Sequence, residues 1–311
     1  MRIVVALGGN ALAKRAEPMT ADRLRANVKS TCQALAELTA EHEVVITHGN
    51  GPQVGLLALQ NLAYRDVAAY PLDILGAETQ GMIGYVIQQE LSNALVGGRP
   101  VTALITTAVV DSDDPAFSHP TKLIGPQYSP QDAAEAAAEY RWTIARDGTM
   151  FRRVVPSPTP LRIQPAGPNP PLLDRGPPVG GVGGGGVPVR IDERGREIGM
   201  QAVVDKDLAS AALAAELDAD LLVMLTDGDY VSENWGTPHQ RDILTASPEA
   251  IAELPFAEGS MQPKVDAAIR IAKAGGRALI GPLDKLPDLL ARRVGTEIRP
   301  DVPEGIVHVG S

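Results

Sequence analysis

Short apolar runs alternate along the chain with longer stretches in which apolar residues recur at helical spacing. Residues 2–7 are almost continuously apolar, which is typical of a buried parallel strand. Between residues 20 and about 40 the apolar positions follow a helical period, which predicts an amphipathic helix. The same alternation predicts further strands at 43–47, 100–110, 187–190, 219–225 and 277–280, and further helices at 72–95, 205–217, 260–275 and 283–291. It favours a parallel sheet that is covered by helices on both faces.

Two segments interrupt this alternation. Residues 111–160 contain a proline-rich loop, a short alanine-rich helix at about 131–140 and a hairpin that turns at Asp147-Gly148. We expect this segment to form a small excursion from the main sheet. Residues 164–186 are rich in proline and glycine, which is typical of a boundary between two lobes.

Composition and charge exclude several classes of function. The 311 residues carry a net charge of -10 and only 4% aromatic side chains, which disfavours nucleic acid as a main partner. The single cysteine, Cys32, excludes an intramolecular disulfide and a four-cysteine zinc site, and its helical pattern predicts a core position. No apolar run is long enough to cross a membrane and the first one is too short for a signal peptide, so we expect a cytoplasmic protein.

Two glycine turns follow the first two predicted strands. Gly8-Gly9-Asn10 comes after residues 2–7, and Gly49-Asn50-Gly51 comes after residues 43–47. Glycine lets a ligand approach the backbone closely, and a helix that starts there offers free N–H groups to an anion. Ordinary strand-to-helix turns would have the same composition. The glycine run at 181–186 is equally open to two interpretations, a phosphate-facing loop or a flexible connection between lobes.

Three lysines occupy positions that a bound anion would account for. Lys206 lies between Asp205 and Asp207 at the start of one predicted helix, and Lys264 follows Ser260 at the start of another. A lysine opposes the dipole at a helix start, so a bound phosphate would give it a purpose. Lys122, on the excursion, is a third candidate. Together with the glycine turns and the strand end at 226–229, these are the parts that phosphoryl transfer needs, although each lysine alone could be a solvated surface charge.

Many strings in the same order along nearly the whole chain resemble the carbamate kinases, which are members of the amino acid kinase superfamily. The strings are GGNAL (8–12), THGNGPQVG (47–55), QGMIGY (80–85), VD with DPAF (110–111 and 114–117), PTK with GP (120–122 and 125–126), RRVVPSP (152–158), GGGG with PV (183–186 and 188–189), DKDLA (205–209) and GSM with PKV (259–261 and 263–265).

The resemblance implies an α/β fold, a three-layer αβα sandwich with a mainly parallel, open central sheet and a protruding subdomain at about 112–158. It implies an N-terminal lobe over 1–180 that binds carbamate and makes dimer contacts, and a C-terminal nucleotide-binding lobe over 181–311. It also implies a homodimer that transfers a phosphoryl group reversibly between ATP and carbamate with Mg²⁺, mainly toward ATP. Such enzymes serve arginine, agmatine, purine or allantoin breakdown.

The same resemblance assigns roles to individual residues. Lys206 and Lys264 would neutralise the transferring phosphoryl group, Asp207 would orient both lysines, and Lys122 would close over the site. The remaining residues would bind the substrates: Gly8, Gly9, Asn10, Gly49, Asn50 and Gly51 on the carbamate side, and Gly184, Gly185, Thr226, Asp227, Asp229, Ser260 and Met261 on the nucleotide side. No residues are expected to form a metal site of their own.

Three segments depart from the family pattern. Residues 177–182 lack the usual apolar strand, residues 228–232 displace the aromatic residue expected near adenine, and Gln262 stands where glycine is common. The first departure predicts a weaker strand between the lobes, and the other two predict altered nucleotide binding. They leave two alternatives to a carbamate kinase. One is a kinase of the same fold that phosphorylates another small acid, and the other is a non-catalytic nucleotide-binding regulator.

Overall fold

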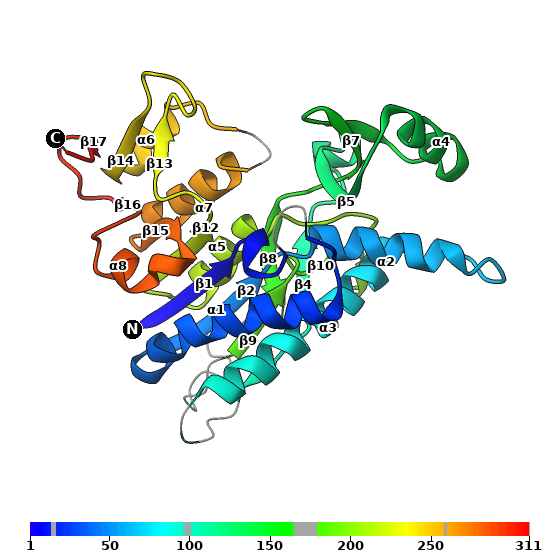
Figure 1. Ribbon diagram of the computed structural model, residues 1–311, viewed down its shortest axis with the longest axis horizontal. Helices are drawn as coiled ribbons and strands as arrows, with labels where there is room; N and C mark the ends of the chain where they lie inside the picture. The colour runs from blue at the N-terminus through cyan, green and yellow to red at the C-terminus, as the bar shows by residue number, and fades with distance from the viewer. Residues whose placement is uncertain (14–16, 96, 98–100, 165–178, 258–259, 311) are drawn as a thin grey trace.

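The computed structural model describes residues 1–13, 17–95, 97, 101–164, 179–257 and 260–310 (Figure 1). Within these residues, ten strands form one open sheet in the order β13-β14-β16-β15-β12-β1-β2-β9-β3, with β17 paired to β14. Its strands are β1 (Arg2–Leu7), β2 (Glu43–His48), β3 (Thr102–Ala103), β9 (Val179–Gly183), β12 (Leu221–Thr226), β13 (Val231–Glu233), β14 (Arg241–Ala246), β15 (Arg277–Pro282), β16 (Thr296–Ile298) and β17 (Ile306–His308). The centre of the sheet, from β15 through β12 and β1 to β2, is parallel.

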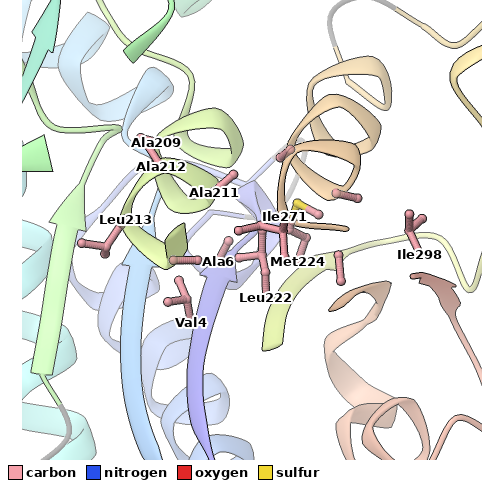
Figure 2. Packing of buried hydrophobic residues seen from close by; sticks show 14 of the residues in the cluster. Val4, Ala6, Ala209, Ala211, Ala212, Leu213, Leu222, Met224, Ile271 and Ile298 are labelled. Atoms are coloured by element: carbon pink, nitrogen blue, oxygen red, sulfur yellow. The ribbon is translucent and has the colours of Figure 1, made fainter. Parts of the chain in front are cut away.

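Alternate residues of the central strands bury two separate cores. Val4 and Ala6 of β1 pack with Leu222 and Met224 of β12 against α5 and α7 (Figure 2). Ile3, Val5 and Leu7 face the other way, into a cluster shared with α1, α3 and α8. Because successive side chains of a strand point to opposite faces, the apolar run 2–7 supplies both cores. The expected three-layer αβα sandwich is therefore confirmed.

The helices correspond closely to the predicted amphipathic stretches. Thr20 caps the first helix by accepting a hydrogen bond from the backbone N–H of Arg23 at 3.3 Å. None of the described helices is both long and apolar enough to pass through a membrane. The helices are α1 (Ala21–Glu41), α2 (Gly51–Ala63), α3 (Leu72–Ala94), α4 (Pro130–Tyr140), α5 (Lys206–Glu216), α6 (Pro248–Ala252), α7 (Gln262–Lys273) and α8 (Leu286–Leu290).

The excursion forms a unit that stands away from the main sheet (Figure 1). It consists of the three-stranded sheet β5-β7-β6, with β5 (Lys122–Tyr128), β6 (Ile144–Asp147) and β7 (Met150–Val155), together with α4. The β6–β7 hairpin turns at Asp147 and Gly148 as predicted. A second sheet, in the order β11-β10-β4-β8, lies between this unit and the main sheet. Its strands are β4 (Thr107–Val110), β8 (Pro160–Gln164), β10 (Val187–Ile191) and β11 (Glu197–Gly199).

One expectation about strands is wrong. The single strand predicted at 100–110 is two strands in different sheets, β3 and β4, and the side chain of Gln80 bonds both backbone groups of Thr106 at the break between them. Where the departure at 177–182 predicts a weaker strand, the structure has β9 from Val179 onward, which pairs with β2 and β3 and shifts its register against β2 between Ile46 and His48. Residues 177 and 178 lie outside the described part of the chain. The boundary expected between residues 180 and 181 falls within β9.

Candidate active site

A cavity of about 840 Å³ opens where β1, β2 and β12 end at their carboxyl edges. This is the edge at which parallel α/β sheets bind ligands. Most of the residues predicted from the sequence line this cavity: Gly8, Gly9, Gly49, Asn50, Gly51, Lys122, Gly184, Lys206, Asp207, Thr226, Asp227, Ser260, Met261 and Lys264. Gly185 and Asp229 do not line it, and the side chain of Asn10 lies outside the described residues.

The first glycine turn lies tightly against the neighbouring strand. A Cβ atom on Gly8 would lie 2.5 Å from the backbone oxygen of Leu225, at the end of β12, so only glycine fits there without a shift. Gly9 begins a short 3₁₀ helix, and nothing lies within 4 Å of the place where its Cβ would be. One glycine therefore permits close packing, and the next leaves its backbone open toward the cavity.

The second glycine turn is built around buried polar side chains. Asn50 precedes α2 and donates from Nδ2 to Oγ1 of Thr79 at 2.7 Å. The neighbouring His48 is buried, with Nδ1 3.1 Å from the backbone oxygen of Gly49, and burial lowers the pKa of His48 to about 4. His48 is therefore neutral near pH 7 and adds no charge to the site. A Cβ on Gly49 would lie 3.2 Å from Cδ of Lys206, so this turn also leaves room for the Lys206 side chain.

The glycine run brings the second turn and the start of α5 together. Gly184 has a φ of +60°, donates its N–H to the backbone oxygen of His48 at 2.7 Å, and lines the cavity. A Cβ on Gly184 would lie only 2.3 Å from Nδ2 of Asn50. Gly185 faces the backbone of Val204 instead. Gly184 therefore lies at the cavity, whereas Gly185 packs against the backbone of Val204.

Two ammonium groups share one buried carboxylate at the centre of the cavity. Nζ of Lys206 donates to Oδ1 of Asp207 at 2.5 Å, and Nζ of Lys264 donates to Oδ2 at 2.7 Å. The three side chains are 12%, 11% and 5% exposed, for Lys206, Lys264 and Asp207 in that order, so water screens their charges little. The lysines hold the pKa of Asp207 well below its usual range although burial opposes them. One aspartate therefore bonds both of the lysines to which the resemblance assigns it.

The pKa values of the two lysines shift in opposite directions. Burial lowers the pKa of Lys206 to about 8, because Asp207 only partly offsets the loss of water and Lys264 repels a second positive charge. Burial also acts to lower the pKa of Lys264, but Asp207 and Asp205 outweigh it, so this pKa is raised. Lys264 therefore stays charged at every physiological pH, whereas Lys206 loses its proton in the weakly alkaline range.

The start of α5 is held by several buried hydrogen bonds. Asp205 caps the helix, because its Oδ1 accepts from the backbone N–H groups of Asp207 at 2.8 Å and Leu208 at 3.4 Å. Ser210 donates to the backbone oxygen of Lys206 at 2.6 Å and lies 2.6 Å from the hydroxyl of Thr47 on β2. These contacts fix Lys206 relative to the strand that carries the second glycine turn.

The third lysine reaches the cavity from the protruding unit. Lys122 begins β5, and its Nζ donates to Oδ2 of Asp205. Burial alone would raise the pKa of Asp205, but the Lys122 ammonium outweighs it and holds the pKa below its usual value. The two aspartates therefore hold different lysines: Asp207 bonds Lys206 and Lys264, and Asp205 bonds Lys122.

Helix α7 begins without a side-chain cap. The residue at its N-cap position is Met261, which makes no capping hydrogen bond, and Ser260 lies one position earlier. The backbone N–H of Ser260 bonds the oxygen of Ala257 at 3.1 Å, so the chain is already turning before the helix begins. Pro263 lies in the first turn. Gly259 lies outside the described residues.

Three aromatic residues line the cavity from the C-terminal half of the chain, which the sequence did not predict. Tyr230, Trp235 and Phe256 form this aromatic end, and Trp235 is 71% exposed. Tyr230 is the displaced aromatic noted above, but nothing in the sequence connects it with Phe256, which lies 26 positions further along. Asp229 does not line the cavity and pairs with Lys285 at 2.7 Å. Among the described residues, no group of three acidic, histidine or cysteine side chains is placed to hold a metal ion.

Comparison with known proteins gives a consistent result. A model of the amino acid kinase family matches residues 1–281. The carbamate kinase of Haemophilus influenzae is 54% identical over 299 residues, covering 96% of each chain, and that of Rhizobium meliloti is 49% identical over 313 residues, covering 99% of this chain and 96% of the other. Among solved structures, the Giardia lamblia carbamate kinase bound to AMP-PNP superposes with a TM-score of 0.86 at 37% identity, covering 96% of this chain and 98% of that one.

Proposed function

Because this chain belongs to the amino acid kinase family and groups within it with the carbamate kinases, we propose that it transfers a phosphoryl group reversibly between ATP and carbamate. The reaction of ATP with carbamate gives ADP and carbamoyl phosphate. We expect the enzyme to run mainly in the reverse direction, toward ATP. The observation that carries this proposal is the Lys206–Asp207–Lys264 unit at the centre of a cavity that is bordered by two glycine turns.

The charges of the site suit the phosphoryl group during its transfer. Lys206 and Lys264 approach from two different helices, so they can contact different oxygens of the transferring group. Phosphoryl transfer depends on alignment and on neutralising the charge spread over these oxygens, with little covalent work by the protein. A carbamate oxygen is already anionic, so it can attack without a general base. Asp207 orients the lysines and takes no proton, because its pKa is held low.

The two ends of the cavity differ in the way the two substrates require. The glycine turns with Asn50 offer backbone and amide N–H groups, which fit the small planar anion carbamate. The aromatic end, with Tyr230 and Trp235, fits a nucleobase. We therefore place carbamate toward the N-terminal lobe, 1–180, and the nucleotide toward the C-terminal lobe, 181–311, with Thr226, Asp227, Ser260 and Met261 lining the nucleotide side.

We further propose that the nucleotide arrives with Mg²⁺, that the enzyme is a homodimer, and that it acts in the cytoplasm, where both nucleotides are available. Mg²⁺ commonly binds phosphate oxygens with few protein ligands, so a nucleotide-borne ion needs no acidic cage of its own. Large exposed side chains on α3 and in the segment between α2 and α3 support the dimer, because exposed apolar surface is often covered by a second chain. They are Tyr64, Tyr70, Ile74, Met82 and Tyr85.

A substrate panel tests the proposed reaction. The purified protein is given Mg²⁺ and ADP with carbamoyl phosphate or acetyl phosphate, and separately ATP with several small carboxylic acids, and nucleotide conversion is followed in each. We expect ATP to form quickly from carbamoyl phosphate alone. Faster turnover of another acid would favour the kinase for another small acid. Nucleotide binding in a calorimeter without turnover of any substrate would favour the regulator.

A further inference from the structure

We propose that Asp205 is a positioning residue for the phosphoryl transfer, because it holds Lys122 of the protruding unit at the active site as the third ammonium group. This inference rests on the proposed function. It assigns to Asp205 a task separate from capping α5. The two tasks use different oxygens of the same carboxylate, so a single substitution can separate them.

The contacts of Asp205 show this division. Oδ1 accepts from the backbone N–H groups of Asp207 and Leu208 at the start of α5, and Oδ2 accepts from Nζ of Lys122. The side chain of Asp205 is 11% exposed and that of Lys122 is 28% exposed, so the ion pair lies mostly out of water. Eighty-three positions separate the two residues in the sequence. The pair therefore connects β5 of the protruding unit directly to the helix that carries Lys206.

Among the residues that the structure describes, no other carboxylate in contact with these lysines can replace Asp205. Both oxygens of Asp207 are already occupied, one by Lys206 and the other by Lys264. Three lysines and two aspartates leave this cluster with one net positive charge. Without the Asp205 charge the excess would be two, and Lys122 would face the repulsion of two buried ammonium groups with nothing to hold it.

Lys122 is also the member of the cluster that is able to move away. Lys206 and Lys264 are fixed on α5 and α7, which pack against the main sheet. Lys122 instead begins β5, which contacts α2 through bare backbone: a Cβ on Gly55 would lie 2.0 Å from Cα of Gly125. This contact between two glycines positions the backbone of β5, but it does not orient the long side chain of Lys122. The ion pair with Asp205 orients that side chain.

A lysine ammonium has three donors, so Lys122 can keep its bond to Asp205 while it contacts a phosphoryl oxygen. Asp205 would then serve Lys122 as Asp207 serves Lys206 and Lys264. Misplacing one charged group by about 1 Å can cost a hundredfold in rate. Asp205 should therefore influence the chemical step more than the binding of substrate.

The test is Asp205→Asn, with Asp205→Ala as its control. Asparagine caps helices about as well as aspartate, so the first variant keeps the cap and loses the charge, whereas alanine loses both. For Asp205→Asn we expect kcat to fall by about tenfold or more, up to the hundredfold that a misplacement of about 1 Å can cost. The KM for carbamoyl phosphate should stay equal or fall, because the site becomes more positive. We expect the melting temperature of Asp205→Asn to fall less than that of Asp205→Ala, because Asn keeps the cap and the freed Lys122, unlike Lys206 and Lys264, can turn into water.

The same substitution is then made in a Lys122→Ala background, as a double-mutant cycle. If Asp205 acts through Lys122, Asp205→Asn has no further effect on kcat there. The proposal is overturned if the same loss recurs in the Lys122→Ala background, if kcat of the single variant stays within twofold of wild type, or if kcat and KM worsen together with the melting temperature.

A second readout does not depend on turnover. Each protein is treated briefly with acetic anhydride, and the acetylation of Lys122 is followed by peptide mass spectrometry. We expect Lys122 to react several-fold faster in Asp205→Asn than in the wild type, because its ion pair is gone. An equal rate would show that Asp205 does not hold Lys122. If the protein makes no ATP from carbamoyl phosphate, the proposed function fails while this measurement still decides on Asp205.

Discussion

Replacing Asp207 by asparagine removes the negative charge that two buried lysines share. The substitution keeps the size of the side chain, but an amide offers one oxygen acceptor where the carboxylate offered two. One of the bonds at 2.5 and 2.7 Å must therefore be lost, and the other is weakened. Lys206 and Lys264 are then buried side by side without an opposite charge between them.

The expected loss of stability follows from this burial. Removing one partner of a buried ion pair costs about 3–5 kcal/mol, because the remaining charge is left without water or a counter-charge. At about 2 °C per kcal/mol for a chain of this size, the melting temperature should fall by about 6–10 °C. The pKa of Lys206, already about 8, should fall further, so that this lysine becomes neutral near pH 7. Losing one such electrostatic group lowers kcat by about 10²–10³.

Calorimetry and the ATP-forming assay measure the two effects, with Asp288→Asn as a matched control. Asp288 pairs with Arg293 at 2.6 Å, but the two side chains are 48% and 66% exposed, so its loss should cost about 0–1 kcal/mol. If Asp207→Asn melts within about 2 °C of this control and keeps more than about a tenth of the wild-type kcat, our reasoning about the buried charges is wrong.

Three further predictions concern other parts of the cavity. Because Lys206 must be charged to act and its pKa is about 8, kcat/KM should fall about tenfold per unit above pH 8, and a profile that stays flat to pH 10 would contradict its role. Gly184→Ala should lower the melting temperature more than Gly195→Ala. Both glycines have positive φ, but an added Cβ would clash with a neighbour, Asn50, only at Gly184, so equal effects would exclude this clash. In a Trp142→Phe variant, which leaves Trp235 as the only tryptophan, ADP should change the fluorescence, and unchanged emission would place the base elsewhere.

The parts of the fold with strong periodicity could be predicted from the sequence. Strands β1 and β12 are central and covered on both faces, so residues 3–7 and 221–225 are unbroken apolar runs. The helix at 21–41 has one buried face and a threonine cap, and both features are local in sequence. The glycine turns were found for the same reason, because a strand end followed by glycine needs no distant partner to be recognised.

The parts that depend on distant partners could not be predicted. Strands β16 and β17 have three residues each, too few for an alternating pattern, and they exist because β15 and β14 pair with them. The pairing of Lys122 with Asp205 joins residues from two units and leaves no local trace. From the sequence alone, Trp235 is an exposed loop residue without a role, and only the structure shows that it lines the cavity.

The central claim is that Lys206 and Lys264 together neutralise the transferring phosphoryl group. The most direct measurement is the rate of ATP formation from ADP, Mg²⁺ and carbamoyl phosphate for the wild type and for Lys206→Ala and Lys264→Ala, each shown by circular dichroism and by size to be folded. Our account predicts rapid turnover by the wild type and loss of turnover in both variants. Near-wild-type rates in the folded variants would contradict it.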